Sequence, residues 1–452
     1  MSETRGPSIT AYLAGLIQRI ESILLSGEDR LDVRQHLLDA IASAFVVCGG
    51  RTFRDLAAGC PRETGGIGWP GSGAERVSSL DGAMLWAFAI NSSVFEDGSR
   101  EGACHPGAVV IPTAIAYAKG QSWDRIERAI VAGYDVMIRL ARAGNPDFTR
   151  KGFHPTAIIG SFGAAATASM LLGCGESAKQ HALSLAALGG GGLMASFRSG
   201  ETQPLQVAFS VRNGILAALM ARAGNRGYLR ILEEGFYPAY LGKDPSPAVD
   251  QPLQYEYAIR GSYLKPYPGC RHVHPSIDAL GEILNKEKVD PTQIQGIVSR
   301  TYKIAVETEI EPVASRGDAY FNVPYALAAR IVLGRNDWDA FDERHFANER
   351  LVEVMKKVRV EIDPEMERAY PKSRGAAVEI DVGKGGPLRG MVAHPLGEPE
   401  NPLPCSVTAE KFRGAAGSFL SQESLERVAD MLSFPSTMES PERLFERLSE
   451  RV

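Results

Sequence analysis

The feature that most constrains the fold of this chain is a helical pattern that runs from about residue 9 to residue 260. Apolar residues recur there at steps of three and four, and glycines end several of the segments. We expect helices at residues 9–26, 34–44, 82–90, 106–119, 123–143, 155–172, 176–188 and 204–223. Several of these segments consist mainly of Ala, Gly and Ser, whose small side chains let helices approach closely. The pattern therefore predicts a tightly packed helical domain.

The pattern changes after Lys265. Shorter alternating runs predict strands at 295–306, 358–362, 376–382 and 388–393, mixed with helices at 275–285, 324–333 and 348–356, and residues 409–416 and 423–432 are helical again. A chain of 452 residues exceeds the size at which one core usually stops growing. We predict a mainly α protein with a large helical domain, residues 1–265 and 400–452, and a smaller α+β lid domain, residues 266–399.

Composition narrows the class of protein. A net charge of -5 and a hydrophobic content of 44% are typical of a soluble protein and give no reason to expect nucleic acid as a partner. The first residues lack the basic flank and apolar core of a secretory signal. The apolar stretch 156–173 is short and rich in small residues, so a buried core helix is expected, with no membrane partner. With neither a signal nor a span expected, we predict a cytoplasmic location. The six cysteines show no paired spacing, which predicts reduced thiols.

Four of the eight histidines stand directly before a proline, where chance would place about half of one such pair. They are His105, His154, His274 and His394. Proline is tolerated in the first turn of a helix and keeps the preceding residue out of helical geometry. A His-Pro pair before an apolar run therefore places an imidazole at a helix N-terminus, where partial positive charge attracts carboxylates and lowers the pKa of the ring. The pattern indicates neutral histidines beside a bound acid.

Two of these pairs carry the strongest signal in the helical region. Glu96, Asp97 and His105 share one polar loop between two apolar helices, and loops held by rigid elements often carry binding groups. His154 precedes the small-residue helix, where a buried imidazole needs a hydrogen-bond partner. The alternatives are a solvated loop for the first group and a simple capping role for His154.

A third polar cluster, residues 265–275, falls at the expected domain junction, a common place for ligand sites. Lys265 and Arg271 are candidates to bind substrate carboxylates. Cys270, His272 and His274 alternate and raise the alternative of zinc, but no second cluster with ligand spacing lies nearby in sequence, so we predict no metal. A weaker alternative is that a cysteine of this cluster acts as a thiolate nucleophile. The segment could also be a domain linker with charged residues and no functional role.

Several segments, taken in order, resemble the MmgE/PrpD family, which contains 2-methylcitrate dehydratase, cis-aconitate decarboxylase and iminodisuccinate epimerase. They are Phe95–Asp97, His105–Pro112, Gly133–Arg139, Gly152–Thr156, Phe162–Ala166, Arg212–Gly214, Lys265–Pro268, Arg271–Pro275 and Pro324–Ala326, with Gly397, Asn401 and Pro402 near the end. The resemblance implies a helical domain, a smaller α+β lid, a homodimer, and an active site between the domains that needs no organic cofactor. It also implies catalytic roles for His105, His154, Lys265 and Tyr325.

The chain departs from the family pattern at the first site. Val94 stands where members often carry an acid, Gly98 where they carry a hydroxyl, and one extra residue precedes His105. Gln203 falls where decarboxylase-like members have a lysine, and Gln206 where they have a histidine. These replacements put a tricarboxylate like cis-aconitate, and standard methylcitrate dehydration, in doubt.

The sequence and the resemblance together predict a cofactor-independent lyase, a dehydratase or decarboxylase, that abstracts a proton next to a carboxylate on a small polycarboxylic acid. His105 or His154 would move the proton, with Tyr325 or Lys265 acting at the other face. The predicted substrate-binding residues are Glu96, Asp97, Gln203, Arg271 and His272. The alternatives are an epimerase or isomerase on the same scaffold, a non-catalytic binder or scaffold, and a metal-dependent hydrolase.

Overall fold

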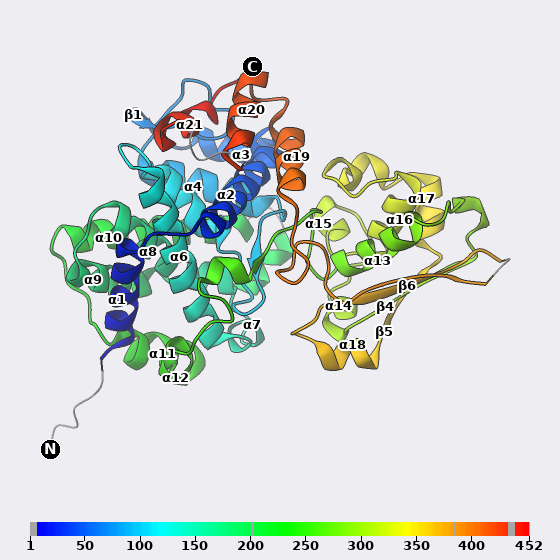
Figure 1. The fold of residues 1–452 in the computed structure, drawn as a ribbon, viewed down its shortest axis with the longest axis horizontal. Helices are drawn as coiled ribbons and strands as arrows, with labels where there is room; N and C mark the ends of the chain where they lie inside the picture. Colours follow the sequence, from blue (N-terminus) through cyan, green and yellow to red (C-terminus); the bar gives the residue numbers. More distant parts are fainter. Residues whose placement is uncertain (1–6, 200–202, 384–385, 433–438, 452) are drawn as a thin grey trace. The chain divides into compact units, whose positions relative to one another are not determined.

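The chain folds into two compact units, Met1–Tyr263 with Pro404–Val452, and Leu264–Leu403. The computed structural model describes residues 7–199, 203–383, 386–432 and 439–451. The larger unit is helical, and the smaller one combines helices with a four-stranded sheet (Figure 1). This confirms the predicted fold class, a mainly α unit joined to a smaller α+β unit.

The eight helices predicted for the larger unit are all present. They are α1 (Ile9–Ser22), α2 (Gly27–Cys48), α4 (Ser79–Ser92), α5 (Gly107–Ala116), α6 (Trp123–Gly144), α8 (Pro155–Leu171), α9 (Glu176–Ala186) and α10 (Gln203–Arg222). The first ends earlier than predicted and the second begins earlier, because Ser26 and Asp29 form a capping box. Each of these two side chains accepts from the backbone N–H of the other residue, which starts α2 at Gly27.

Several short elements of this unit were not predicted. The helices are α3 (Arg51–Ala58), α7 (Asp147–Arg150), α11 (Tyr237–Leu241) and α12 (Ser246–Val249), with a π-helix at Leu232–Phe236. Strand β1 (Arg62–Ile67) forms single antiparallel bridges to Val77 through Arg62 and Ile67, and β2 (Gly98–Ser99) pairs antiparallel with β3 (Ser262–Tyr263). A Cβ on Gly98 would lie 2.3 Å from the Tyr263 hydroxyl, so the space beside Gly98 is filled by that ring.

Helix α8 forms the centre of the larger unit: all of its residues are buried, and it packs against α5, α6, α9 and α10. Small residues make this packing possible. A Cβ on Gly133 of α6 would lie 2.2 Å from Thr167 Oγ1, and one on Gly214 of α10 would lie 2.2 Å from the Ser161 carbonyl. Among the described residues, α10 is the one helix long and apolar enough to cross a membrane by length and composition, and 56% of its apolar window is buried, as in a core helix.

The C-terminal segment returns to the larger unit. Its helices are α19 (Cys405–Ala416), α20 (Gln422–Ala429) and α21 (Pro441–Arg447), and α19 packs along α2 (Figure 1). Lys411 of α19 donates to Asp39 Oδ1 at 2.6 Å and to the Phe95 carbonyl at 2.6 Å. Helix α19 therefore supports the loop that carries Glu96, Asp97 and His105.

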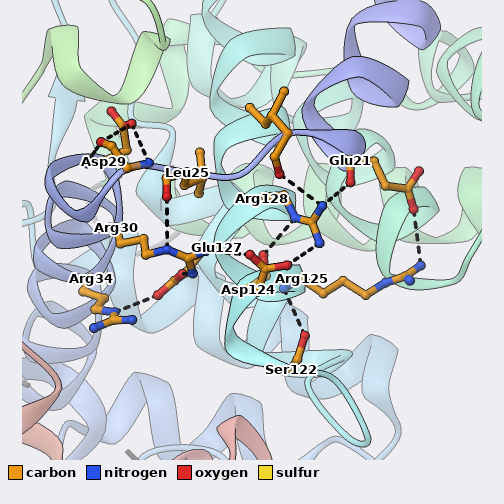
Figure 2. Close-up of polar contacts among 12 residues, drawn as sticks. Glu21, Leu25, Asp29, Arg30, Arg34, Ser122, Asp124, Arg125, Glu127 and Arg128 are labelled. Atoms are coloured by element: carbon orange, nitrogen blue, oxygen red, sulfur yellow. Dashed lines mark hydrogen bonds and ion pairs between the residues drawn. The ribbon is translucent and has the colours of Figure 1, made fainter. Parts of the chain in front are cut away.

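An ionic cluster joins the start of α2 to the start of α6 (Figure 2). Glu127 is fully buried and accepts from Arg34 at 2.7 Å and from Arg30 at 2.5 Å. Arg30 also donates to Asp124 at 2.7 Å, and Arg128 pairs with the same carboxylate. Two arginines on one buried carboxylate fix the register of α2 against α6.

The smaller unit contains a sheet with the strand order β5-β4-β6-β7, formed by Val358–Ile362, Gly296–Thr301, Ala376–Asp381 and Leu388–Val392. Strands β4 and β5 run parallel, and the other two pairs are antiparallel. The predicted strand 295–306 is too long, because α14 (Lys303–Glu307) begins right after β4. The predicted helices correspond to α13 (His274–Leu284), α16 (Val323–Val332) and α17 (Glu349–Met355), whereas α15 (Arg316–Ala319) and α18 (Pro364–Ala369) were missed.

Helix α13 covers the sheet of the smaller unit at β6 and β7. A Cβ on Gly390 of β7 would lie 2.0 Å from the Ala279 carbonyl, so helix and strand touch through their backbones. Ser276 of the helix and Ser299 of β4 share a hydrogen bond of 2.9 Å between their hydroxyls.

Candidate active site

The loop between α4 and α5, residues 93–106 and here called the site loop, carries three of the predicted site residues. Its backbone is strained at two places: Val94 has φ 50° and Ala103 has φ 48°. Left-handed geometry is unfavourable for residues other than glycine, above all for a β-branched one. Such strain persists only where the surroundings impose it, and it is frequent at functional sites.

His105 is held by its backbone and by one ring nitrogen. Its N–H donates to Thr156 Oγ1 in the first turn of α8 at 3.1 Å. Its Nδ1 lies 2.6 Å from the Asp97 carbonyl oxygen. Since a carbonyl oxygen only accepts, Nδ1 carries the hydrogen, and in the neutral ring the lone pair lies on Nε2. About a quarter of the side chain, 26%, is exposed.

The Asp97 carboxylate is a buried structural acceptor. It receives hydrogen bonds from His36 Nδ1 at 2.7 Å, from the Tyr134 hydroxyl at 2.6 Å and from the Gly107 N–H at 2.9 Å. Burial alone would raise the pKa of Asp97, but the contacts with His36, Tyr134 and Gly107 outweigh it and lower the pKa. Asp97 thus holds the site loop onto three helices, and its predicted contact with substrate stays a prediction.

Glu96 lies beside the imidazole of His105. Its Oε1 is 3.7 Å from His105 Nδ1 and accepts from Asn91 Nδ2 at 2.9 Å. The other oxygen, Oε2, is buried and receives no hydrogen bond within the described part of the chain. Gln203 Nε2 donates to Asn91 Oδ1 at 3.1 Å, which continues the chain of contacts to α10. The amide of Gln203 is therefore used in positioning Asn91 and, through it, Glu96.

His154 is the N-cap of α8 and makes no side-chain capping bond. Its Nδ1 lies 3.1 Å from Gln206 Nε2, and the Phe197 ring packs edge-on at 5.1 Å between ring centres. Burial, with a smaller contribution from the charge of His105, lowers the pKa of His154 to about 3. The ring is neutral at pH 7, as the His-Pro pattern predicts, and burial is the main cause.

The glycine segment 189–192 supports the same helix end. The His154 N–H donates to the Gly192 carbonyl at 3.2 Å, and a Cβ on Gly192, with φ 152°, would lie 2.5 Å from Ala157 Cβ. These glycines therefore allow a close approach of the backbone to the first turn of α8.

The smaller unit carries the other predicted residues. Lys265 is 1% exposed, and its charge acts on the nearby thiol of Cys270. His272 Nδ1 lies 2.8 Å from the Tyr302 hydroxyl, and burial together with Arg374 and Arg271 lowers the pKa of His272 to about 3.

Arg271 is bound mainly within its own unit. It donates to Glu398 at 3.0 Å, to His274 Nδ1 at 3.0 Å and to the carbonyls of Leu396 and Pro395 at 3.0 and 3.2 Å. Four of its five N–H groups are thus used on these protein atoms. The geometry supports a role for Arg271 in holding the 395–398 turn.

Tyr325 lies on α16 and is buried. Its hydroxyl donates to the Ala340 carbonyl at 2.7 Å, and its ring packs against Phe341 and Phe346. Burial raises the pKa of this hydroxyl above its usual value. Nothing in these contacts distinguishes Tyr325 from a core aromatic, so its catalytic role rests on the family resemblance.

The remaining His-Pro pairs, at His274 and His394, do not place their histidine just before a helix as the first two do. His274 is the first residue of α13 rather than the residue before it, and its ring faces Arg271 and Tyr267. No helix begins at His394-Pro395; His394 lies in a bend, and its Nδ1 is 3.8 Å from Glu400 Oε2. No group of three or more His, Cys, Asp or Glu side chains suited to a metal occurs among the described residues.

Several residues of the site were missed or left without a role in the sequence analysis. They are His36 and Asp39 on α2, Asn91 on α4, Tyr134 on α6, Gln206 on α10 and Lys411 on α19. One signal was available: α2 and α6 contain polar residues on faces that are otherwise apolar, and buried polar groups need partners. The identity of those partners depends on the tertiary fold.

Fold and site define a two-unit protein whose helical unit presents two histidines beside helix N-termini. Residues 12–248 match the MmgE/PrpD N-terminal domain, and residues 267–433 match the MmgE/PrpD C-terminal domain. The chain therefore belongs to the MmgE/PrpD family.

Curated relatives match over most of the chain. The cis-aconitate decarboxylase-like protein oryM of Aspergillus oryzae is 24% identical over 403 residues, which cover 82% of each chain. The cis-aconitate decarboxylase of Homo sapiens is 26% identical over 369 residues, 78% of this chain and 75% of the relative. That of Mus musculus is 25% identical over 446 residues, 93% of this chain and 89% of the relative.

Proposed function

We propose that this protein is a lyase that labilises the bond next to a carboxylate in a small carboxylic acid, with His105 and His154 at the reacting centre. The observation that carries the proposal is the placement of the two rings at neighbouring helix ends. The backbone of His105 is bonded to Thr156, two residues after His154, and the charge of His105 acts on the pKa of His154. The relatives named cis-aconitate decarboxylase support lyase chemistry at the level of the family.

The N-termini of α5 and α8 suit a carboxylate substrate. Helix N-termini carry unpaired N–H groups and partial positive charge, which favour anions. A base beside such a site can remove a carbon-bound proton, and the electron pair moves toward the carboxylate to give an enolate-like intermediate. Positioned acid and base groups contribute about 10²- to 10⁴-fold each, so electrostatic stabilisation of the intermediate must supply much of the remainder.

Three outcomes share this chemistry. In dehydration, the carbon-bound proton goes to the base, a C=C bond forms, and the hydroxyl leaves as water after receiving a proton. In decarboxylation, the C–C bond to the departing CO₂ breaks, and its electron pair is protonated at carbon. In epimerisation, the proton is removed from one face and returned to the other.

The preferred reaction is decarboxylation or dehydration of an acid that differs from cis-aconitate. The named relatives favour decarboxylation. Val94 and Gln203 replace an acid and a lysine of the family pattern, and the Gln203 amide is bonded to Asn91. Loss of the cation at position 203 favours a substrate with fewer carboxylates.

The proposal also includes the residues of the smaller unit and the assembly. On the strength of the family resemblance, Lys265 and Tyr325 act on the substrate, no organic cofactor takes part, and the protein is a homodimer. The sequence pattern adds Arg271 and His272 as substrate-binding residues, the absence of a metal, and a cytoplasmic location. Light scattering at micromolar concentration tests the dimer, and full activity after dialysis against a chelator tests the absence of a metal.

The function itself is tested by incubating the full-length protein with citrate-, aconitate- and aspartate-like acids and following the mixture by NMR. Formation of an alkene with loss of water, or of CO₂ with the decarboxylated acid, absent in His105→Gln, supports the lyase. Inversion of a stereocentre without elimination would show that the protein is an epimerase and not a lyase. If no acid is changed and the cellular phenotype survives His105→Ala and Lys265→Ala, the protein is a binder rather than an enzyme.

A further inference from the structure

The two histidines present the same ring nitrogen to opposite kinds of partner. Nδ1 of His105 faces the carbonyl oxygen of Asp97 at 2.6 Å, whereas Nδ1 of His154 faces the side-chain nitrogen of Gln206 at 3.1 Å. A carbonyl accepts and an amide nitrogen donates. The two rings therefore carry their hydrogens on different nitrogens when both are neutral.

The orientation of the Gln206 amide is set by its other contacts. The backbone N–H of Leu193 can only donate, and it lies 2.8 Å from Gln206 Oε1. The amide nitrogen is left to donate to Ser196 Oγ at 2.8 Å and to His154 Nδ1. His154 Nδ1 is consequently an acceptor, and the hydrogen of the neutral ring is on Nε2.

We propose, building on the lyase function above, that His105 is the base, that neutral His154 is the donor to the developing oxyanion, and that Gln206 is the positioning residue that fixes the tautomer of His154. The division of roles follows from the two tautomers. His105 offers the lone pair of Nε2, and His154 offers the hydrogen of its Nε2.

Protons and electrons balance in this assignment. Nε2 of His105 takes the carbon-bound proton, and the C–H electron pair moves into the carboxylate, whose oxygen gains negative charge. His154 Nε2–H donates a hydrogen bond to that oxygen and keeps its proton, as neutral imidazoles do when they polarise a carbonyl. The His105 imidazolium then gives the proton to the leaving hydroxyl, which departs as water while the electron pair of the intermediate forms the C=C bond.

The surroundings of each histidine support the role assigned to it. The imidazolium of His105 would lie 3.7 Å from the buried carboxylate of Glu96, which stabilises positive charge on the ring. His154 packs against the ring of Phe197 and lies beside the amide of Gln206, and the charge of His105 acts on its pKa. Its low pKa keeps it neutral throughout the physiological range.

The tautomers are measured by two-bond ¹H–¹⁵N NMR on the full-length protein labelled with [¹⁵N]histidine, with signals assigned by single His→Gln variants. We expect His154 as the Nε2–H tautomer and His105 as the Nδ1–H tautomer at pH 7. The tautomers themselves are read from the wild-type spectrum, and the His→Gln variants serve only to assign its signals. An Nδ1–H tautomer at His154 overturns the proposal.

Gln206→Glu tests the positioning role. A carboxylate at this place accepts, so His154 must carry a hydrogen on Nδ1, its pKa must rise, and kcat must fall about 10²-fold with a smaller change in KM. Gln180→Glu, which adds the same charge on α9, is the matched control and leaves both readouts unchanged. An unaltered tautomer or kcat in Gln206→Glu contradicts the role of Gln206. If both histidines have the expected tautomers but the protein converts none of the tested acids, the lyase function is refuted. The catalytic roles of His105 and His154 are then refuted with it.

Discussion

The Nδ1 atom of His36 on α2 lies 2.7 Å from Asp97 Oδ2 in the site loop, and both side chains are buried. Because a carboxylate only accepts, His36 donates, and the contact joins the part of the loop before His105 to helix α2. The same carboxylate accepts from Tyr134 and from the Gly107 N–H. The position of His105 therefore depends on a residue that need not touch substrate.

Asp97→Asn is expected to lower the free energy of unfolding by about 2–4 kcal/mol, because an amide cannot accept from all three donors and leaves buried groups unpaired. Tyr134→Phe removes a single hydrogen bond and should cost about 1 kcal/mol. Urea denaturation followed by tryptophan fluorescence measures both. Equal losses in the two variants would contradict the account of Asp97 as the shared acceptor.

Gly98→Ala is expected to destabilise the helical unit by about 1–3 kcal/mol, because the new methyl group would overlap the Tyr263 ring. Tyr263→Val opens that space, so the double variant should recover part of the loss contributed by the alanine. A double-mutant cycle on unfolding free energies measures this coupling. Simple additivity of the two effects would show that the ring does not fill the site.

Burial of His154 makes stability depend on pH. The pKa of His154 is lowered from 6.5 to about 3, so below pH 6.5 the unfolded chain binds a proton that the folded chain does not. The free energy of unfolding should fall as pH decreases from 6.5 toward 3, by up to about 1.4 kcal/mol per pH unit for this group.

Burial raises the pKa values of Asp39 and Asp135 to about 6, so these two groups make the free energy of unfolding rise as pH decreases. A variant that lacks only the His154 imidazole separates its contribution from theirs. His154→Asn should lose less stability than the wild type over the same acid range. Denaturation curves at pH 7, 6, 5 and 4 test this, and parallel pH dependence in both proteins would be inconsistent with a buried neutral His154.

Glu127→Gln is expected to lower the unfolding free energy by about 3–5 kcal/mol, because Arg34 and Arg30 lose a fully buried carboxylate. Asp124 lies at the edge of the same cluster with 37% of its side chain exposed. Asp124→Asn should therefore cost less than about 1 kcal/mol. Thermal denaturation of the two variants compares them directly, and similar shifts would contradict the distinction between buried and exposed ion pairs.

Much of the fold could be predicted because it depends on local periodicity. The small-residue pattern of 155–172 indicates a helix that is buried on all sides, and α8 has that character. Strand 376–382 alternates, and β6 follows the pattern. The strand predicted at 295–306 was too long, because the alternating pattern of β4 continues into α14 without a break in composition.

The site could be predicted only in part. Proline after His105 and His154 marks helix ends, and the structure brings the two residues together. Their tautomers could not be predicted, because they depend on Asp97, Gln206 and Leu193, which the fold brings together with the two rings. His36 and Lys411 are 61 and 316 residues away from the atoms they hold in the site loop, a relation that no local pattern contains.

The central claim, that His105 removes a carbon-bound proton beside a carboxylate, is tested most directly by reaction in D₂O. With an acid that the wild type accepts, mass spectrometry and ¹H NMR should find solvent deuterium at the carbon next to the carboxylate in substrate recovered before the reaction is complete. His105→Gln should reduce this incorporation by about 10²- to 10⁴-fold, whereas His394→Gln, at a His-Pro pair that begins no helix and has no proposed role, leaves it unchanged. Incorporation at the wild-type rate in His105→Gln would contradict the account.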